Sequence, residues 1–166
     1  EVVANYLLYH EQKPNLFYGS GTPSCSLMAR TNTFNSVGGF DTNLRRVEDI
    51  DFAIRLSIQN GCFIGTSKEL FKQYSTDAID KSPLKNLNAE QILVSKYKEY
   101  LDQRNLFQYA YRWPKLRFFH FTNQYHLLFK ELVILIFLYP ARTINHFFKT
   151  GSQRLIHEFL IYKGKK

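Results

Sequence analysis

The chain has 166 residues, of which 45% are hydrophobic and 16% aromatic, and it carries a formal net charge of +8. This length is enough for a domain with a hydrophobic core, and this composition argues against intrinsic disorder. The positive charge lies near the C-terminus, because residues 115–166 hold 9 Lys and Arg against 2 Asp and Glu, whereas residues 1–114 hold 13 against 12. Such a tail favours contact with an anionic membrane or a nucleic acid, and a solvated basic face without a partner is the alternative.

The first predicted strand lies ahead of a glycine pair. Residues 24–30 alternate between polar and apolar side chains, which is typical of a strand with one buried face. Residues 31–37 form a short helical or irregular link, and Gly38-Gly39 ends it.

The two cysteines, Cys25 and Cys62, both lie in strand-like apolar segments and show no metal-binding spacing. We therefore expect two buried, reduced thiols, which fits a cytosolic compartment. The sequence begins at Glu1 rather than at an initiator Met, and no signal peptide follows, so we expect this chain to be part of a longer protein.

Residues 49–60 form the best-supported helix, and Gly61 is its expected stop. Apolar side chains recur there at the helical period, at Ile50, Ala53, Ile54 and Ile58. Residues 63–65 then predict a short strand.

A loop over residues 66–87 precedes a second helix, predicted over residues 89–104 with Asn88 as its N-cap. Beyond residue 113, aromatic and basic side chains alternate with apolar ones. The apolar run over residues 132–139 is far shorter than the roughly 20 residues that a membrane span needs.

Three carboxylates, Glu48, Asp49 and Asp51, lie at the start of the helix predicted over residues 49–60. Acidic side chains stabilise a helix N-terminus by roughly 0.3–1 kcal/mol each, so helix capping alone is one interpretation. Arg55 lies four residues after Asp51 and can neutralise it, which leaves Glu48 and Asp49 at the helix entrance. An ionised carboxylate in that position suits a general base, and from spacing alone the two interpretations stay open.

The order of motifs resembles the acceptor-side half of a family 2 glycosyltransferase. The resemblance covers roughly residues 17–66 and is carried by Val37-Gly38-Gly39-Phe40-Asp41, then Glu48-Asp49-Ile50-Asp51, then Arg55. It implies that Asp49 is the general base and that Glu48 positions the acceptor sugar. We also predict substrate contacts at Gly38, Gly39, Asp51, Arg55 and Arg46. The pair Arg45-Arg46 could touch a diphosphate, and a solvated loop pair is the alternative.

The sequence departs from that family in two ways. Nothing before residue 17 can supply the nucleotide-binding half with its Asp-x-Asp metal motif, and residues 69–75 lack the His that many relatives use as a metal ligand. The metal ligands within this chain are therefore unknown. The resemblance implies a divalent cation, Mn or Mg, whose ligands lie mostly outside this chain.

Together these patterns predict an α/β chain with a partial GT-A-like fold (nucleotide-diphospho-sugar transferase) and a helical C-terminal extension. Residues 1–110 would form the acceptor-side part, and residues 111–166 the basic, aromatic-rich extension. The predicted partners are a nucleotide-sugar donor, a glycan or glycolipid acceptor and an anionic membrane surface on the cytoplasmic face.

Three alternatives stay open. One is a non-catalytic, membrane-associated scaffold or binding module, and in another the extension packs as ordinary core helices. A nucleic-acid-binding domain is the least favoured, because no RNA- or DNA-binding signature occurs in the sequence.

Overall fold

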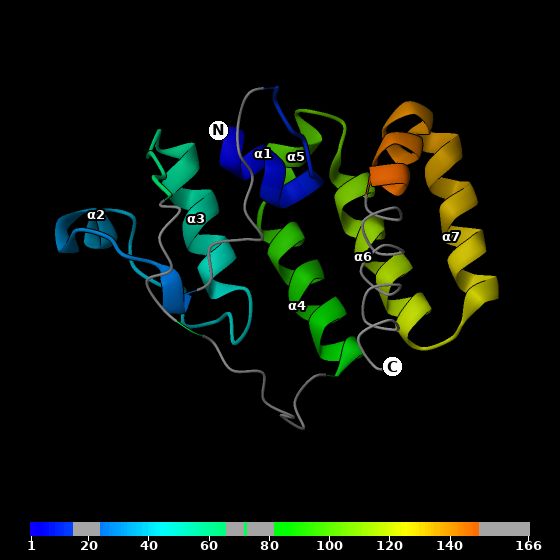
Figure 1. Ribbon diagram of the computed structural model, residues 1–166, viewed down its shortest axis with the longest axis horizontal. Helices are drawn as coiled ribbons and strands as arrows, with labels where there is room; N and C mark the ends of the chain where they lie inside the picture. Colours follow the sequence, from blue (N-terminus) through cyan, green and yellow to red (C-terminus); the bar gives the residue numbers. More distant parts are fainter. Residues whose placement is uncertain (15–23, 66–71, 73–81, 150–166) are drawn as a thin grey trace. The chain divides into compact units, whose positions relative to one another are not determined.

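The computed structural model describes residues 1–14, 24–65, 72 and 82–149, and every regular element within them is helical (Figure 1). The elements are α1 (Val2–Tyr9), the 3₁₀ helix η1 (Ser24–Ser26), α2 (Thr31–Ser36), α3 (Glu48–Ile58), α4 (Pro83–Lys96), α5 (Lys98–Asp102), α6 (Phe107–Phe121) and α7 (Tyr125–Leu138). A further helical stretch covers residues 140–149. The chain divides into two compact units, Glu1–Pro114 and Lys115–Lys166.

The predicted α/β fold is wrong, because the described part of the chain contains no strand. Residues 24–30 form η1 and an extended link, and Cys25 and Met28 are exposed. Residues 63–65 are likewise irregular, and Cys62 is exposed. Alternation stabilises a strand only when neighbouring strands pair with it, and here none does among the described residues. The expectation of two buried thiols fails for the same reason.

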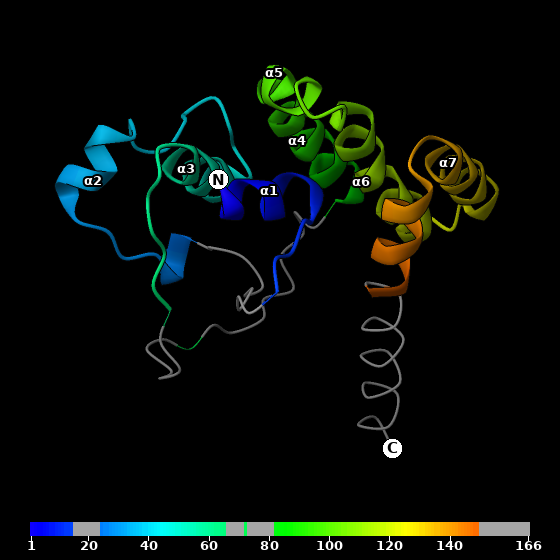
Figure 2. The ribbon, with the colours of Figure 1, turned by 90° about the horizontal axis from the view of Figure 1, so that it is seen from above.

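Helix α3 is the centre of the first unit and packs against α1, as Figures 1 and 2 both show. Its side chains at Phe52, Ala53 and Ile54 are fully buried. The first helix is joined to it by hydrogen bonds: the backbone N–H of Ala4 donates to Ser57 Oγ at 3.0 Å, and the amino terminus donates to the Ser57 carbonyl at 2.9 Å. The N-terminal segment is thereby fixed to the C-terminal end of α3, opposite the acidic first turn.

The prediction of a helix over residues 49–60 is confirmed within two residues. Its C-terminus is formed by Asn60, which adopts a left-handed φ of 61°, and by Gly61, whose N–H donates to the Leu56 carbonyl at 2.8 Å. This geometry is a Schellman-type cap. A Cβ on Gly61 would lie 2.4 Å from the Leu56 side chain, so glycine is required there by close packing.

The second predicted helix begins earlier than expected and is interrupted. It starts at Pro83, a residue favoured in the first turn, so Asn88 lies inside α4 rather than at its N-cap. Tyr97, with φ −100° and ψ 23°, separates α4 from α5. The loop predicted over residues 66–87 falls mostly outside the described residues.

The second unit contains the end of α6, α7 and the stretch over residues 140–149. A left-handed Asn123 ends α6, and Lys115 forms an ion pair with Glu131 of α7 at 3.6 Å. Buried Thr143 donates its hydroxyl to the Leu135 carbonyl at 2.9 Å, which joins the last stretch to α7. No helix in the described ranges is both long and apolar enough to cross a bilayer.

Candidate functional site

The acidic residues open α3 as predicted, and they follow a strained residue. Val47 has φ 59° and ψ 17°, a left-handed conformation that is unfavourable for a β-branched side chain. Such strain costs on the order of 1–3 kcal/mol and persists only where the surrounding structure enforces it. Val47 therefore fixes the direction in which the chain enters the acidic turn.

Asp49 lies in the first turn of α3 and is half-buried. Its Oδ1 accepts a hydrogen bond from the Ile50 N–H at 2.8 Å, one of the amide groups that a helix N-terminus leaves without an intrahelical partner. Neither Asp49 nor Glu48 forms an ion pair with any residue that the structure describes. Asp49 consequently keeps a second carboxylate oxygen for another donor.

Asp51, one turn further, is fully buried and has three partners. Its Oδ2 accepts from Arg55 Nε at 2.8 Å. Its Oδ1 accepts from the Tyr97 hydroxyl at 2.7 Å and lies 2.8 Å from Lys96 Nζ. A buried carboxylate is tolerated only when it is paired and hydrogen-bonded, and these contacts meet that need. The predicted pairing of Asp51 with Arg55 is confirmed.

Arg55 joins α3 to the glycine pair. Besides its bond to Asp51, the guanidinium donates to the Val37 carbonyl and, at 2.5 Å, to the Gly39 carbonyl. Gly38 and Gly39 both have positive φ, 87° and 63°, and a Cβ on Gly39 would lie 3.0 Å from the Phe34 ring. The turn after α2 thus needs glycine for its conformation, and Arg55 holds it against α3.

Lys96 links this arrangement to a second carboxylate, Asp41, whose Oδ2 lies 2.7 Å from Lys96 Nζ. The bond from Lys96, reinforced by the backbone N–H of Asn43, lowers the pKa of Asp41 from 3.8 to about 2. Burial alone would lower the pKa of Lys96, but the bonds to Asp41 and Asp51 outweigh burial and raise it. The lysine therefore stays charged and bridges α4 to both acidic groups.

Tyr97 completes the network from the junction of α4 and α5. Burial, followed by its contact with Asp51, raises the pKa of its hydroxyl well above the ordinary value. The hydroxyl is therefore neutral at physiological pH and acts as a hydrogen-bond donor to Asp51.

The structure brings four of the predicted substrate-binding residues into one network: Gly38, Gly39, Asp51 and Arg55. Arg46 is elsewhere, and its guanidinium donates to the Asn86 side chain of α4. All the contacts described above are between groups of the protein itself. Contact of these five residues with substrate therefore stays a prediction.

Sequence reasoning missed Lys96 and the ionic role of Asp41. One signal was present: Lys96 lies three residues after Leu93 and one before Tyr97, and both of these side chains are buried. A lysine on an inward helix face calls for a buried carboxylate. No group of three or more His, Cys, Asp and Glu side chains suited to a metal occurs in the described ranges, so metal use stays a prediction from resemblance.

Comparison with protein-family models, with curated proteins and with solved structures finds no match to this chain.

Proposed function

We propose that this chain supplies the acceptor-side carboxylates of an inverting glycosyltransferase, with Asp49 as the general base and Glu48 as the group that positions the acceptor. The observation that carries the proposal is the difference in burial and pairing between Asp49 and Asp51. Asp51 is buried and neutralised by Arg55 and Lys96, whereas Asp49 is half-buried and accepts a single hydrogen bond from the backbone. The strain at Val47 next to this turn is a second supporting feature, since strained residues cluster at functional sites.

In the proposed reaction, an acceptor hydroxyl attacks the anomeric carbon of a nucleotide sugar. The new carbon–oxygen bond forms as the bond to the nucleoside diphosphate breaks, which inverts the anomeric configuration. Asp49 takes the hydroxyl proton as the new bond forms, and Glu48 accepts a hydrogen bond from the acceptor sugar. A divalent cation, Mn or Mg, would offset the diphosphate charge, and we expect its ligands to lie mostly outside this chain.

The described residues contain only helices, which contradicts the α/β fold expected from the resemblance. We therefore propose the function without that fold. The acceptor is a glycan or a lipid-linked sugar, and the proposed location is the cytoplasmic face of a membrane. A non-catalytic, membrane-associated module is the second candidate, favoured by the apolar surface of α7.

The test is an Asp49→Asn substitution in the complete gene product. Release of nucleoside diphosphate is measured across a panel of nucleotide sugars with glycan and lipid-linked acceptors. Removing a general base lowers turnover by about 10²- to 10⁴-fold, and we expect that loss without a change in thermal midpoint. Asp102→Asn, at an exposed carboxylate paired with Lys98, is the matched control and keeps the wild-type rate. Wild-type turnover by Asp49→Asn would refute the assignment, and no turnover by wild type with any donor would favour the binding module.

A further inference from the structure

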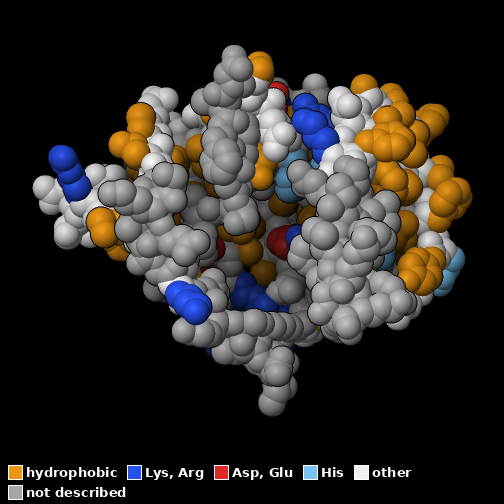
Figure 3. Space-filling view, viewed as in Figure 1, with side chains coloured by type: hydrophobic (Ala, Val, Ile, Leu, Met, Phe, Trp, Pro, Cys, Tyr) orange, Lys and Arg blue, Asp and Glu red, His pale blue; other side chains and the backbone are white. Residues whose placement is uncertain are grey.

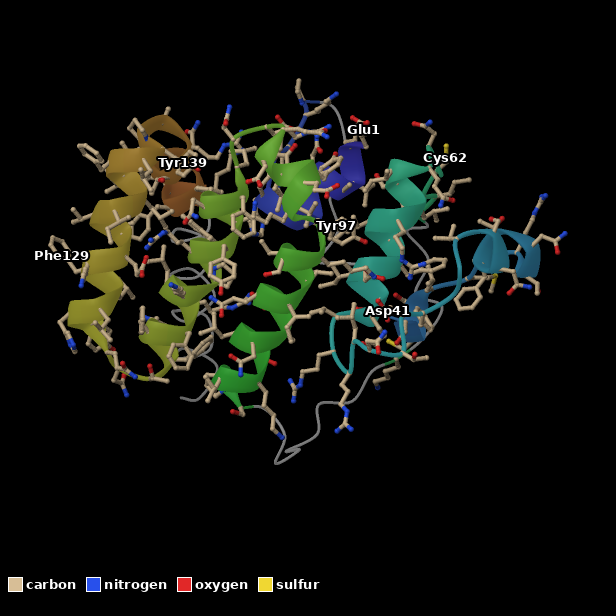
Figure 4. The ribbon with its side chains drawn as sticks, turned by 180° about the vertical axis from the view of Figure 1, so that it is seen from behind. Glu1, Asp41, Cys62, Tyr97, Phe129 and Tyr139 are labelled. Carbon is tan, nitrogen blue, oxygen red and sulfur yellow. The ribbon has the colours of Figure 1, made fainter. Side chains whose placement is uncertain are left out.

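Helix α7 presents an apolar stripe to solvent (Figure 3). Leu138 is exposed elsewhere on the helix, but the other exposed apolar side chains recur at intervals of three and four residues and so lie on one face: Tyr125, Phe129, Val133, Ile136 and Phe137. Phe129 and Phe137 are 67% and 87% exposed, whereas Leu135 on the opposite side is fully buried. Figure 4 shows Phe129 pointing away from the rest of α7.

The stripe has a counterpart on the following stretch over residues 140–149. Ile144, Phe147 and Phe148 are exposed there, and Thr143 attaches the stretch to α7 through the Leu135 carbonyl. The second unit therefore holds two joined helical segments that both expose large apolar side chains. Exposed apolar surface gathered in this way marks an interaction site rather than ordinary surface.

Positive charge accompanies these apolar side chains. Residues 115–149 contain five Lys and Arg and one acidic residue, Glu131, so their net charge is +4. Glu131 is already paired with Lys115. The charge of this segment is therefore complementary to an anionic surface.

We propose that α7 and residues 140–149 lie on an anionic lipid surface, with Phe129, Val133 and Phe137 entering the boundary between headgroups and acyl chains. A helix that exposes an apolar face beside Lys and Arg can bury that face in the headgroup boundary, and each basic residue near an anionic surface adds to the attraction. At 14 residues, α7 is about 21 Å long, shorter than the roughly 30 Å hydrocarbon core, so it lies along the surface.

Other occupants fit these observations less well. A second copy of the chain would bring two segments of charge +4 together, which is unfavourable. A nucleic acid would contact the basic residues but would leave Val133 and Ile136 exposed. The inference deepens the proposed location by naming the contacting face, and it does not require that the protein transfer sugar.

The test is sedimentation of the purified chain with vesicles of phosphatidylcholine, with and without about one third phosphatidylglycerol. We expect wild type to bind the anionic vesicles and to lose binding at high salt. Phe129→Ser with Phe137→Ser should lower the partition coefficient about ten-fold or more, since two large apolar groups no longer insert. Met28→Ser with Ile64→Ser, at side chains 92% and 97% exposed in the first unit, is the matched control and keeps wild-type binding.

Absence of wild-type binding, equal binding to neutral and anionic vesicles, or unchanged binding by the Phe129 and Phe137 variant would each overturn the proposal. A lipid-free dimer that this variant dissociates would also overturn it, because the stripe would then cover a second copy. The assay contains no sugar donor, and Asp49→Asn should bind vesicles like wild type. Failure of this inference is therefore distinguishable from failure of the proposed reaction.

Discussion

Replacement of Asp51 by Asn tests the interpretation of the ionic network. The substitution keeps the size of the side chain and an oxygen that can accept from Tyr97, but it removes the charge that neutralises Arg55 and Lys96. Arg55 would then face a neutral, fully buried group, and Lys96 would keep only its pairing with Asp41. Breaking a buried ion pair by removing one partner costs about 3–5 kcal/mol.

We expect a value near the lower end, about 3 kcal/mol, because Arg55 and Lys96 are partly exposed and water can relieve their charge. For a chain of this length, that loss corresponds to a fall in melting temperature of roughly 6–12 °C. Urea unfolding followed by circular dichroism gives the free energy of unfolding, and a thermal scan gives the midpoint.

Asp102→Asn is the control, since Asp102 and Lys98 form an exposed pair at the same i,i+4 spacing. Its removal should change the free energy of unfolding by less than about 0.5 kcal/mol. A loss below about 1 kcal/mol for Asp51→Asn, or equal losses for the two variants, would refute the view that Asp51 holds α3, α4 and the glycine turn together.

Two further predictions concern stability. Gly61→Ala should lower the free energy of unfolding by about 1–3 kcal/mol, because a Cβ there would meet the Leu56 side chain at 2.4 Å and its carbonyl at 2.8 Å. Gly65→Ala, which meets nothing within 4 Å, is the control, and similar losses in both variants would contradict the packing argument. The Asp41 carboxyl should titrate by NMR with a midpoint of about 2 rather than 3.8. Because its folded pKa is lowered, its contribution to stability should be present above pH 3.8 and lost as the pH falls toward 2, and a midpoint near 3.8 would show that the Lys96 contact is absent in solution.

Helix α3 could be predicted from the sequence because local signals agreed. Its apolar residues follow the helical period, its first turn is acidic, and Asn60-Gly61 ends it. The pairing of Asp51 with Arg55 follows from helix geometry alone. Interactions within one turn of a helix need no knowledge of the remaining fold.

The prediction of strands was wrong because the stability of a strand depends on neighbouring strands, which a local sequence pattern does not specify. Alternation over residues 24–30 is compatible with a buried strand, but this segment exposes Cys25 and Met28. Apolar side chains nearby pack instead around Phe52, through Phe34 and Leu27. Lys96 was missed for a related reason, since its two carboxylate partners lie 45 and 55 residues away in the sequence.

The network around Asp51 has a consequence for local opening of the first unit. Apolar contacts can slide by small amounts at little cost, but hydrogen bonds to a buried carboxylate are directional and are lost on small displacements. Separation of the glycine turn from α3 would break the bonds of Arg55 to the turn's carbonyls, and separation of α4 would break the bonds of Lys96 and Tyr97 to Asp51. These three segments, with the acidic turn of α3 among them, should therefore exchange their amide hydrogens as one cooperative unit.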